Sequence, residues 1–380
     1  MRIVYVLTSL GMGGAERQVL ALGERMSIRG HAVLLLILRP GLAQEWPTRL
    51  DVFHLDMRKT PPSVLDSVAR GRSFLREFHP DIVHSHGFHG NLMARIFRLL
   101  SDSPAPISTI HNVYEGGWIR MTAYRLTDRF SRLTTAVSAA AADRFVRLKA
   151  VPASKCIVLA NGIDTEEFAP NPERRLRVRN EMNLRDEFVW LAAGRIVPAK
   201  DYPNLLRAFA QVKASISNTQ LWIAGEAVGA EAARLRALSA DLGLADAVHW
   251  LGLRRDLPAL LDASDGFALG SAWEGMPLAV GEAMAMEKPV VATDVGGTRE
   301  LLGETGALVP ARDPPALSQA MLAIMKTSCD DRRALGRSAR LRIVNSFSMD
   351  AKADEWEALY RSVVLREQWT LSKHIPHLRR

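Results

Sequence analysis

Cysteine and long apolar runs are both scarce in this chain of 380 residues. The two cysteines, Cys156 and Cys329, lie far apart and without the spacing of a metal site, which suits a reducing cytoplasm. No stretch reaches the roughly 18 uncharged apolar residues of a membrane-spanning helix. The N-terminus has one basic residue, a short apolar run and no small-residue cleavage site, so we expect a first β-strand rather than a signal peptide.

Excess positive charge is confined to the first part of the chain. Residues 1–165 contain 21 Lys and Arg against 13 Asp and Glu, a balance of +8, whereas residues 166–380 contain 28 of each. A charge excess restricted to one part of a protein favours binding of a ligand or surface of opposite sign there. We therefore expect an anionic partner for residues 1–165.

Apolar runs alternate with helical patterns in both halves, which is typical of βαβ units in parallel sheets covered on both faces. The length suits two domains of about 150–200 residues each. A turn at Asn161-Gly162 and the prolines that follow mark the change of domain. The expected strands cover residues 3–8, 31–38, 81–84, 107–110, 188–193, 220–224, 247–250, 266–269 and 289–293.

The stretch 266–309 carries the most informative pattern. Glu274 falls in a loop after an apolar run, and we expect a helix with Pro277 as its first residue and Glu282 one turn further on. The free N–H groups of a helix start suit a phosphate, and ionised carboxylates accept hydrogen bonds from pairs of hydroxyls. A nucleotide sugar offers a diphosphate, a ribose and a hexose. The alternative is a capped helix whose Glu282 lies on a solvated face.

Arg195 and Lys200 follow the first strand of the second half, so they belong to the same sheet edge as Glu274. Two cations facing a helix start would neutralise the diphosphate of a leaving nucleotide. The alternative is a pair of solvated loop charges.

A glycine loop at residues 11–16 precedes the first helix, expected at 15–29. Its sixth position is Glu16, where a dinucleotide fingerprint requires Gly or Ala. The second strand ends at Arg39, which would accept a 2′-phosphate, so an NADP enzyme is disfavoured rather than excluded. The loop still offers backbone N–H groups to an oxyanion.

Histidines gather at the ends of the third and fourth strands. His84 and His86 resemble a metal pair, but no Cys or carboxylate nearby completes a ligand set, so no metal is expected. His111 directly follows the strand at 107–110 and is the best candidate in this half to touch a sugar. Residues 116–135 are interpreted either as a basic amphipathic helix at a membrane interface or as an ordinary surface helix.

These motifs together resemble the glycosyltransferase-4-like family of retaining enzymes with the GT-B fold. The resemblance spans nearly the whole chain and rests on E-x7-E at Glu274 and Glu282, Gly194-Arg195 with Lys200, Asn161-Gly162-Ile163-Asp164, Asp294-Val295-Gly296-Gly297 and Gly13-Gly14-Ala15-Glu16. It implies two facing Rossmann-like α/β/α domains with parallel sheets and an interdomain cleft. Residues 1–165 would bind the acceptor and 166–346 the nucleotide sugar, while 347–380 would form a helix that crosses back and a basic tail.

The resemblance also implies a role for each matching residue. Glu282 would accept hydrogen bonds from the ribose hydroxyls, and Glu274 would accept them from the donor-sugar hydroxyls. Gly275, Pro277 and the N–H groups of Met276 and Leu278 would lie beside the donor. Arg195 and Lys200 would hold the diphosphate, Gly13 and Gly14 would approach it from the other domain, and His111 would lie near the reacting carbon. Retention would arise by front-face attack without a protein nucleophile or metal.

Three positions depart from the family pattern. Glu287 stands where a glycine commonly ends the E-x7-E helix, and a non-glycine residue in that left-handed conformation costs about 1 kcal/mol. Asp201 also stands where glycine is frequent. Ala227 replaces a glycine near the nucleotide base, which makes the base preference harder to infer.

We therefore expect a cytoplasmic, metal-independent hexosyltransferase that moves a hexose from a nucleotide diphosphate sugar to a hydroxyl acceptor. The expected acceptor is a glycan or a lipid-linked glycan at the inner face of an anionic membrane, without a cofactor or a nucleic-acid partner. The alternatives are a sugar-nucleotide epimerase, a glycogen-type phosphorylase and, from another class, an NADP-binding oxidoreductase.

Overall fold

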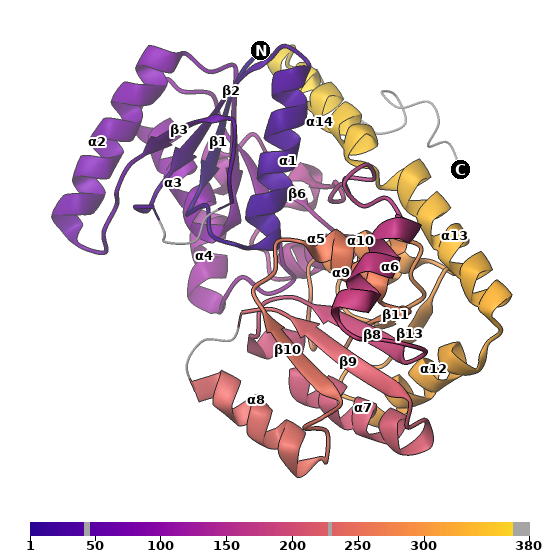
Figure 1. The fold of residues 1–380 in the computed structure, drawn as a ribbon. Helices are drawn as coiled ribbons and strands as arrows, with labels where there is room; N and C mark the ends of the chain where they lie inside the picture. Colours follow the sequence, from indigo (N-terminus) through magenta and orange to yellow (C-terminus); the bar gives the residue numbers. More distant parts are fainter. Residues whose placement is uncertain (42–45, 227–229, 368–380) are drawn as a thin grey trace. The chain divides into compact units, whose positions relative to one another are not determined.

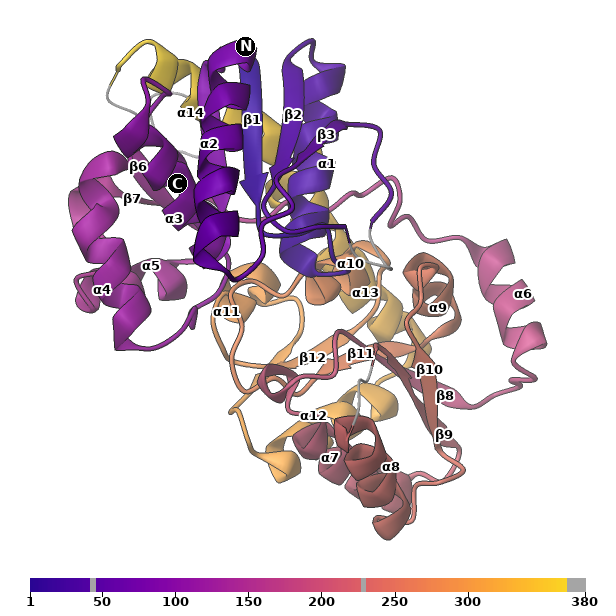
Figure 2. The ribbon, with the colours of Figure 1, turned by 90° about the vertical axis from the view of Figure 1, so that its left-hand side faces the viewer.

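The computed structural model describes residues 1–41, 46–226 and 230–367, so Ala227 and the basic tail after residue 367 lie outside the described residues. The chain divides into two compact units (Figures 1 and 2). Met1–Gly162 and Met349–Arg380 belong to the first unit, and Ile163–Ser348 forms the second. None of the helices in the described ranges combines the length and the apolar character needed to cross a bilayer.

The first unit contains a parallel sheet of seven strands in the order β3-β2-β1-β4-β5-β6-β7. Its strands are β1 (Arg2–Leu7), β2 (Ala32–Ile37), β3 (Asp51–His54), β4 (Ile82–His86), β5 (Ile107–Ile110), β6 (Leu133–Ala136) and β7 (Cys156–Val158). Its helices are α1 (Gly14–Ile28), α2 (Pro61–Phe78), α3 (Gly87–Leu100), α4 (Trp118–Thr127), η1 (Asp128–Phe130), α5 (Ala139–Arg147), η2 (Ala153–Lys155) and α14 (Met349–Val364).

Alternation of side chains along β1 explains why helices cover both faces of this sheet. Ile3 and Tyr5 pack with residues of α1 and α14, whereas Val4 and Val6 pack with residues of α2 and α3. Successive side chains of a strand point to opposite faces, and both sets here are apolar and fully buried. Helix α14 lies beside α1 (Figure 1), and its Trp356 is part of the core of the first unit.

The second unit contains a parallel sheet of six strands in the order β10-β9-β8-β11-β12-β13. Its strands are β8 (Phe188–Ala193), β9 (Thr219–Ala224), β10 (Val248–Gly252), β11 (Gly266–Leu269), β12 (Val290–Thr293) and β13 (Ala307–Val309). Its helices are α6 (Pro172–Glu181), η3 (Pro198–Lys200), α7 (Tyr202–Ser215), α8 (Ala230–Asp241), α9 (Leu257–Ala263), α10 (Leu278–Ala285), α11 (Thr298–Leu302), α12 (Pro314–Lys326) and α13 (Cys329–Ser346).

In both sheets the strand order runs outward from a central strand in two directions. The chain reverses between β1 and β4 in the first unit and between β8 and β11 in the second. In doubly wound sheets of this kind, ligands bind outside the carboxyl ends of the strands at the point of reversal. The expected parallel α/β architecture is therefore confirmed for each unit.

The expectation of one helix over residues 116–135 is wrong in its last third. Helix α4 ends at Thr127, the chain makes a 3-10 turn, and Leu133–Ala136 forms β6 between β5 and β7. The β-branched Thr134 and Thr135 are fully buried in that strand, because pairing on both sides outweighs the helical periodicity of the arginines.

Candidate active site

Glu274 lies in the loop between β11 and α10, at the carboxyl end of the central strands of the second unit. Its side chain is buried, with 7% of the residue exposed. Ser271 Oγ donates to Glu274 Oε1 at 2.6 Å, and Lys200 Nζ donates to the same oxygen at 2.7 Å. A carboxylate held by a hydroxyl and an ammonium has a defined orientation and is ready to accept further hydrogen bonds from a ligand.

Lys200 reaches Glu274 because its stem passes over a glycine. Gly194, directly after β8, has φ +148, and a Cβ there would lie 3.0 Å from Lys200 Cε. Tyr202 Oη donates to Gly194 O at 2.7 Å, and a Cβ on Gly225 would lie 2.0 Å from the same carbonyl. The loop after β8 is therefore packed on both sides, which holds Lys200 over the site.

The loop after β12 closes the other side of Glu274. Gly296 has φ +56, and a Cβ there would lie only 2.1 Å from Glu274 O. Gly297 N donates to Gly275 O at 2.7 Å. The Asp-x-Gly-Gly motif is thus required by the close approach of two backbone segments, independently of any ligand.

Helix α10 begins one residue later than expected. Pro277 is the N-cap residue with an extended backbone (φ −75, ψ 103), and Leu278 is the first helical residue. Pro277 O accepts from Val280 N at 3.1 Å, and the N–H groups of Leu278 and Ala279 belong to the first turn, which precedes the intrahelical acceptors. Glu282 is 6% exposed, so it does not lie on a solvated helix face.

The Asn-Gly-Ile-Asp motif supports α10 from beneath. Ile163 packs so closely on Gly281 that a Cβ there would lie 2.7 Å from Ile163 Cδ1. Asp164 Oδ1 accepts from the backbone N–H groups of Glu166 and Glu167 at 3.1 and 2.9 Å, which shapes the turn that follows. Ile163 therefore lies under the helix residue directly before Glu282.

Arg195 is not part of the polar centre at Glu274. It lies in the same loop as Lys200 but is exposed, and it makes no hydrogen bond or ion pair with any residue that the structure describes. Of the two cations singled out by the sequence, only Lys200 is positioned by protein contacts.

In the first unit, three histidine rings lie in a row at the ends of β4 and β5, with His84 and His86 buried and His111 partly exposed. His86 Nδ1 and His111 Nε2 are 3.0 Å apart. His84 Nε2 lies 2.6 Å from Thr109 Oγ1, and its Nδ1 lies 2.7 Å from Tyr360 Oη. His84 is therefore hydrogen-bonded to α14. At the other end of the row of rings, His111 begins the loop after β5.

Burial disfavours the charged form of these rings. It lowers the pKa of His111 to about 4, and it lowers the pKa values of His84 and His86 well below their ordinary value, with the neighbouring histidines acting in the same direction. His111 is therefore neutral near pH 7. In the His86–His111 contact, one nitrogen carries a hydrogen and donates the hydrogen bond, and the other nitrogen accepts that hydrogen bond.

A small cavity of about 10 Å³ lies beside these rings. Its polar lining includes Gln18, His86, Thr109, His111 and Asn161, and this volume is about that needed for one water. The sequence singled out His111 for a ligand role but not Gln18, because an interior helix residue carries no distinguishing pattern.

Gly13 and Gly14 form the start of α1 as its N-cap and first residue. The carboxylate of Glu16 lies against this loop, since a Cβ on Gly13 would fall 2.2 Å from Glu16 Oε2. Trp46 Nε1 donates to Gly13 O at 3.3 Å. The loop is therefore held by its own neighbours as well as being a helix start.

Two family models match different parts of the chain. The model described as Glycosyltransferase Family 4 matches residues 12–167, and the model described as Glycosyl transferases group 1 matches residues 187–327. The first therefore falls mainly in the first unit and the second in the second unit.

The chain is also similar to characterised proteins. It is 27% identical over 311 residues to UDP-Gal:alpha-D-GlcNAc-diphosphoundecaprenol alpha-1,3-galactosyltransferase of Escherichia coli, which covers 76% of each chain. It is 32% identical over 236 residues to GDP-mannose-dependent alpha-(1-6)-phosphatidylinositol monomannoside mannosyltransferase of Mycolicibacterium smegmatis, with 58% of this chain and 60% of the relative covered.

Solved structures share the fold. HepE of Anabaena, crystallised with UDP and glucose, has a TM-score of 0.84 at 22% identity and covers 95% of this chain and 100% of its own. A glycosyltransferase of Rickettsia africae has a TM-score of 0.81 at 20% identity, with 96% and 98% covered. Together with the two parallel α/β units, these matches show that the chain belongs to the group 1, family 4-like glycosyltransferases of the GT-B fold, which transfer a glycosyl unit from a nucleotide-sugar donor.

Proposed function

We propose that the donor is bound at the centre formed by Glu274, Lys200 and α10 in the second unit. The observation that carries this proposal is the contact of Lys200 Nζ with Glu274 Oε1 beside the start of α10. Glu274 accepts hydrogen bonds from hydroxyls of the donor sugar, and Glu282 accepts hydrogen bonds from hydroxyls of the ribose. Backbone N–H groups of Met276 and Leu278, beside Gly275 and Pro277, lie along the donor.

The leaving diphosphate is stabilised by cations in this proposal. Negative charge develops on the oxygen that bridges sugar and phosphate, and positioned cations are most effective where charge develops. Lys200 is already held in place, whereas exposed Arg195 is free to turn towards the diphosphate when the donor binds. For Gly13, Gly14 and the neutral ring of His111 in the first unit, a role in binding the donor is the prediction that the family resemblance implies.

Transfer with retention, without a metal or a protein nucleophile, is also part of the proposal. Glu274 Oε1 is engaged by Ser271 and Lys200, which suits an acceptor of hydrogen bonds better than an attacking group. In the described ranges no three His, Cys, Asp or Glu side chains come together as a metal site. Proton NMR of the first-formed product tests the stereochemistry, and a product of inverted configuration would contradict retention.

A direct test of the donor site compares calorimetric titrations of nucleotide diphosphate into wild type, Lys200→Met and Glu282→Ala. Both changes are expected to weaken binding by at least about tenfold, since each removes a charged hydrogen-bond partner. Arg207→Gln, an exposed change on α7, is the matched control and should bind as wild type does. Unchanged binding in both variants would overturn this placement of the donor.

We further propose that the acceptor is a glycan on a lipid carrier at the inner face of the membrane, reached from the cytoplasm. The matched galactosyltransferase acts, by its name, on a diphosphoundecaprenol-linked sugar. In this chain, helix α4 exposes Trp118, Ile119 and Leu126 by 77%, 66% and 68%. Apolar side chains between arginines suit an anionic membrane interface.

A basic hollow adjoins α4. It has a volume of about 530 Å³, and half of its lining residues are apolar. The charged lining residues are four cations and one acidic residue, namely Arg125, Arg129, Lys149, Lys155 and Asp128. Lys155 Nζ is 3.1 Å from Asp128 Oδ2, so that carboxylate is already neutralised. The remaining positive charge favours contact with anionic headgroups.

Sedimentation with vesicles tests this surface. Binding to phosphatidylserine-containing vesicles at low salt should be lost in Ile119→Ser/Leu126→Ser and kept in Leu65→Ser/Leu341→Ser, whose leucines are equally exposed (71% and 60%). Binding that is equal in the two double variants, or absent in wild type, would contradict the membrane proposal without affecting the donor site.

A further inference from the structure

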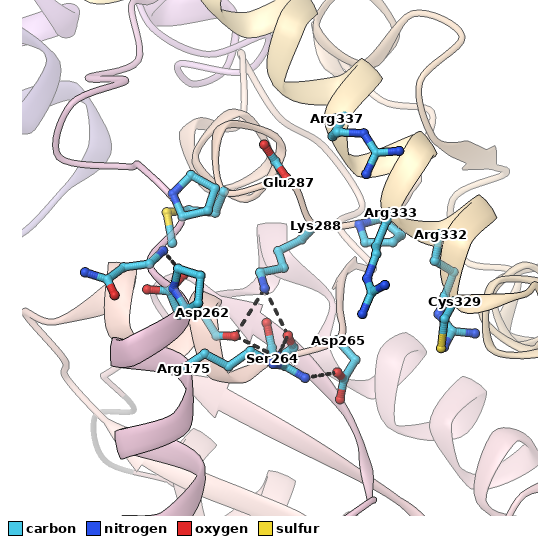
Figure 3. Close-up of a pocket in the computed structure, with 15 residues that line it drawn as sticks. Arg175, Asp262, Ser264, Asp265, Glu287, Lys288, Cys329, Arg332, Arg333 and Arg337 are labelled. Atoms are coloured by element: carbon cyan, nitrogen blue, oxygen red, sulfur yellow. Dashed lines mark hydrogen bonds and ion pairs between the residues drawn. The ribbon is translucent and has the colours of Figure 1, made fainter.

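A pocket in the second unit lies at the end of the sheet opposite to Glu274, where the amino ends of the strands are found (Figure 3). Ser264 and Asp265 directly precede β11, and Lys288 directly precedes Pro289 and β12, so the pocket is at the amino ends of these strands. Glu274 follows the carboxyl end of β11. The volume of about 440 Å³ is in the usual range of small-molecule sites, about 300–1,000 Å³.

Cations dominate the lining of this pocket. Figure 3 shows three of them on α13 and the others on the facing segments: Arg175, Lys288, Arg332, Arg333 and Arg337. Arg333 and Arg337 are one turn apart on α13. Like charges at this spacing destabilise a helix by about 0.2–0.5 kcal/mol, so their position favours a bound counter-charge.

Two of the three carboxylates in the lining are already neutralised by arginines, and one of these arginines, Arg175, is itself a lining cation. Asp262 is paired with Arg174 Nε, which lies outside the pocket lining. Asp265 Oδ1 is 2.5 Å from Arg175 Nη2, and its Oδ2 is 3.2 Å from Arg179 Nη1. Of the acidic residues, only Glu287 is left to face the remaining cations.

Arg332 donates to the carbonyls of Met325 and Thr327, whereas Lys288, Arg333 and Arg337 have no strong anionic partner among the described residues. Lys288 Nζ donates to the carbonyls of Asp262 and Ser264 at 3.2 and 3.1 Å and forms no ion pair within the described part of the chain. Its burial and the nearby Arg175 lower its pKa to about 8. Arg333 approaches only the exposed Asp330, at 3.5 Å, and Arg337 has no hydrogen bond or ion pair with a described residue.

We propose that this pocket is a second ligand site, separate from the donor site, that binds a small phosphate ester or diphosphate. The guanidinium groups of Arg333 and Arg337 donate to the phosphate oxygens, and the ammonium of Lys288 lies opposite. Glu287 and Lys288 directly follow the last turn of α10, whose eight residues span about 12 Å. The bound anion therefore touches the far end of the helix that carries Glu282.

Cys329 provides a local readout for this site. Its thiol lines the pocket and is exposed, and Arg332 Nη2 lies 3.2 Å from its sulfur. Cys156 is the internal reference, because burial raises its pKa to about 11 and slows its reaction. The experiment measures alkylation of both cysteines by peptide mass spectrometry, with and without pyrophosphate.

Alkylation of Cys329 in wild type should fall about tenfold at about ten times the Kd of pyrophosphate, while that of Cys156 stays constant. Lys200→Met, altered in the donor site, should show the same protection. Arg333→Gln/Arg337→Gln should show none. The control Arg177→Gln/Arg207→Gln removes two exposed arginines outside the pocket, and it should keep the protection.

Three results would overturn the proposal. The first is equal protection by sodium chloride at the same ionic strength, which would mean screening alone. The second is protection that survives in Arg333→Gln/Arg337→Gln or disappears in Lys200→Met. The third is absence of protection in wild type. None of these depends on the function of the donor site.

Discussion

Lys200 Nζ and Glu274 Oε1 are 2.7 Å apart, although the two residues are separated by 74 positions in the sequence. Their side chains are only 18% and 9% exposed. An ion pair in such a position gains little net stability, because desolvation of both charges opposes their attraction. Its presence at the carboxyl ends of β8 and β11 is better explained by ligand binding than by folding.

This ion pair leads to a double-mutant prediction. Lys200→Met should lower kcat by about 10²-fold or more, since a cation near the leaving group is lost. It should also cost about 2 kcal/mol of unfolding free energy by leaving Glu274 buried without its cation. In Lys200→Met/Glu274→Gln, the free energy of unfolding measured in urea should return to the wild-type value, while kcat stays low. Recovery of activity in the double variant would contradict a role in transfer.

Gly296 is predicted to be essential for the loop that holds Glu274. Gly296→Ala combines a positive φ with a contact of 2.1 Å to Glu274 O, and we expect a loss of about 3 kcal/mol or more. Gly243→Ala is the matched control, because Gly243 has φ +70 but nothing within 4 Å of its Cβ, and it should cost about 1 kcal/mol. If Gly296→Ala and Gly243→Ala lowered the melting temperature equally, the close approach of Gly296 to Glu274 O would be unimportant for stability.

Acid stability should depend on the buried histidines. His111 has a pKa of about 4 in the fold and about 6.5 when unfolded. The unfolded chain therefore binds more protons between these values, and stability falls as pH decreases from about 6.5 to about 4, by up to about 3 kcal/mol for His111 alone. Urea unfolding across this range should show a shallower decrease in His111→Asn than in wild type. An unchanged slope in His111→Asn would refute the assignment.

Glu287 and Asp201, two of the eight non-glycine residues with positive φ in the described ranges, should respond differently to glycine. Glu287 has φ +58 after α10, so Glu287→Gly should raise the free energy of unfolding by about 1 kcal/mol. Asp201 has φ +42, but its side chain also accepts from Asn204 N at 3.4 Å as the N-cap of α7. Asp201→Gly should therefore gain less, because it loses this cap. A larger gain for Asp201→Gly would contradict this interpretation.

The parallel sheets and the meeting of Glu274 with Lys200 could be predicted from the sequence. Apolar runs mark buried parallel strands, and residues that follow neighbouring strands meet at one sheet edge. Four observed strands, β3, β6, β7 and β13, are absent from the expected set. The arginines that flank β6 have a helical spacing, and the other three are short edge strands without a fully buried apolar run. Proline is favoured at the first helical position, which predicts Pro277 there, but Pro277 lies one position earlier as the N-cap of α10.

Other features depend on packing that no local pattern contains. The partner of His86 directly follows β5, and the partners of His84 lie on β5 and α14, so the register of the sheet and the packing of α14 bring them together. The pocket at Lys288 combines residues of α6, α9, α13 and the segments before β11 and β12. Its cations are ordinary surface charges in the sequence, and they become a group only when α13 packs against α10.

The most direct test of the account is the melting temperature of wild type and Glu282→Ala against UDP-, GDP-, ADP- and TDP-sugars, with NADP as the control. A ligand that binds only the folded state raises the melting temperature. We predict a shift with one nucleotide family in wild type that is lost in Glu282→Ala. A shift with NADP alone, or a nucleotide-sugar shift that is unchanged in Glu282→Ala, would contradict the proposed donor site.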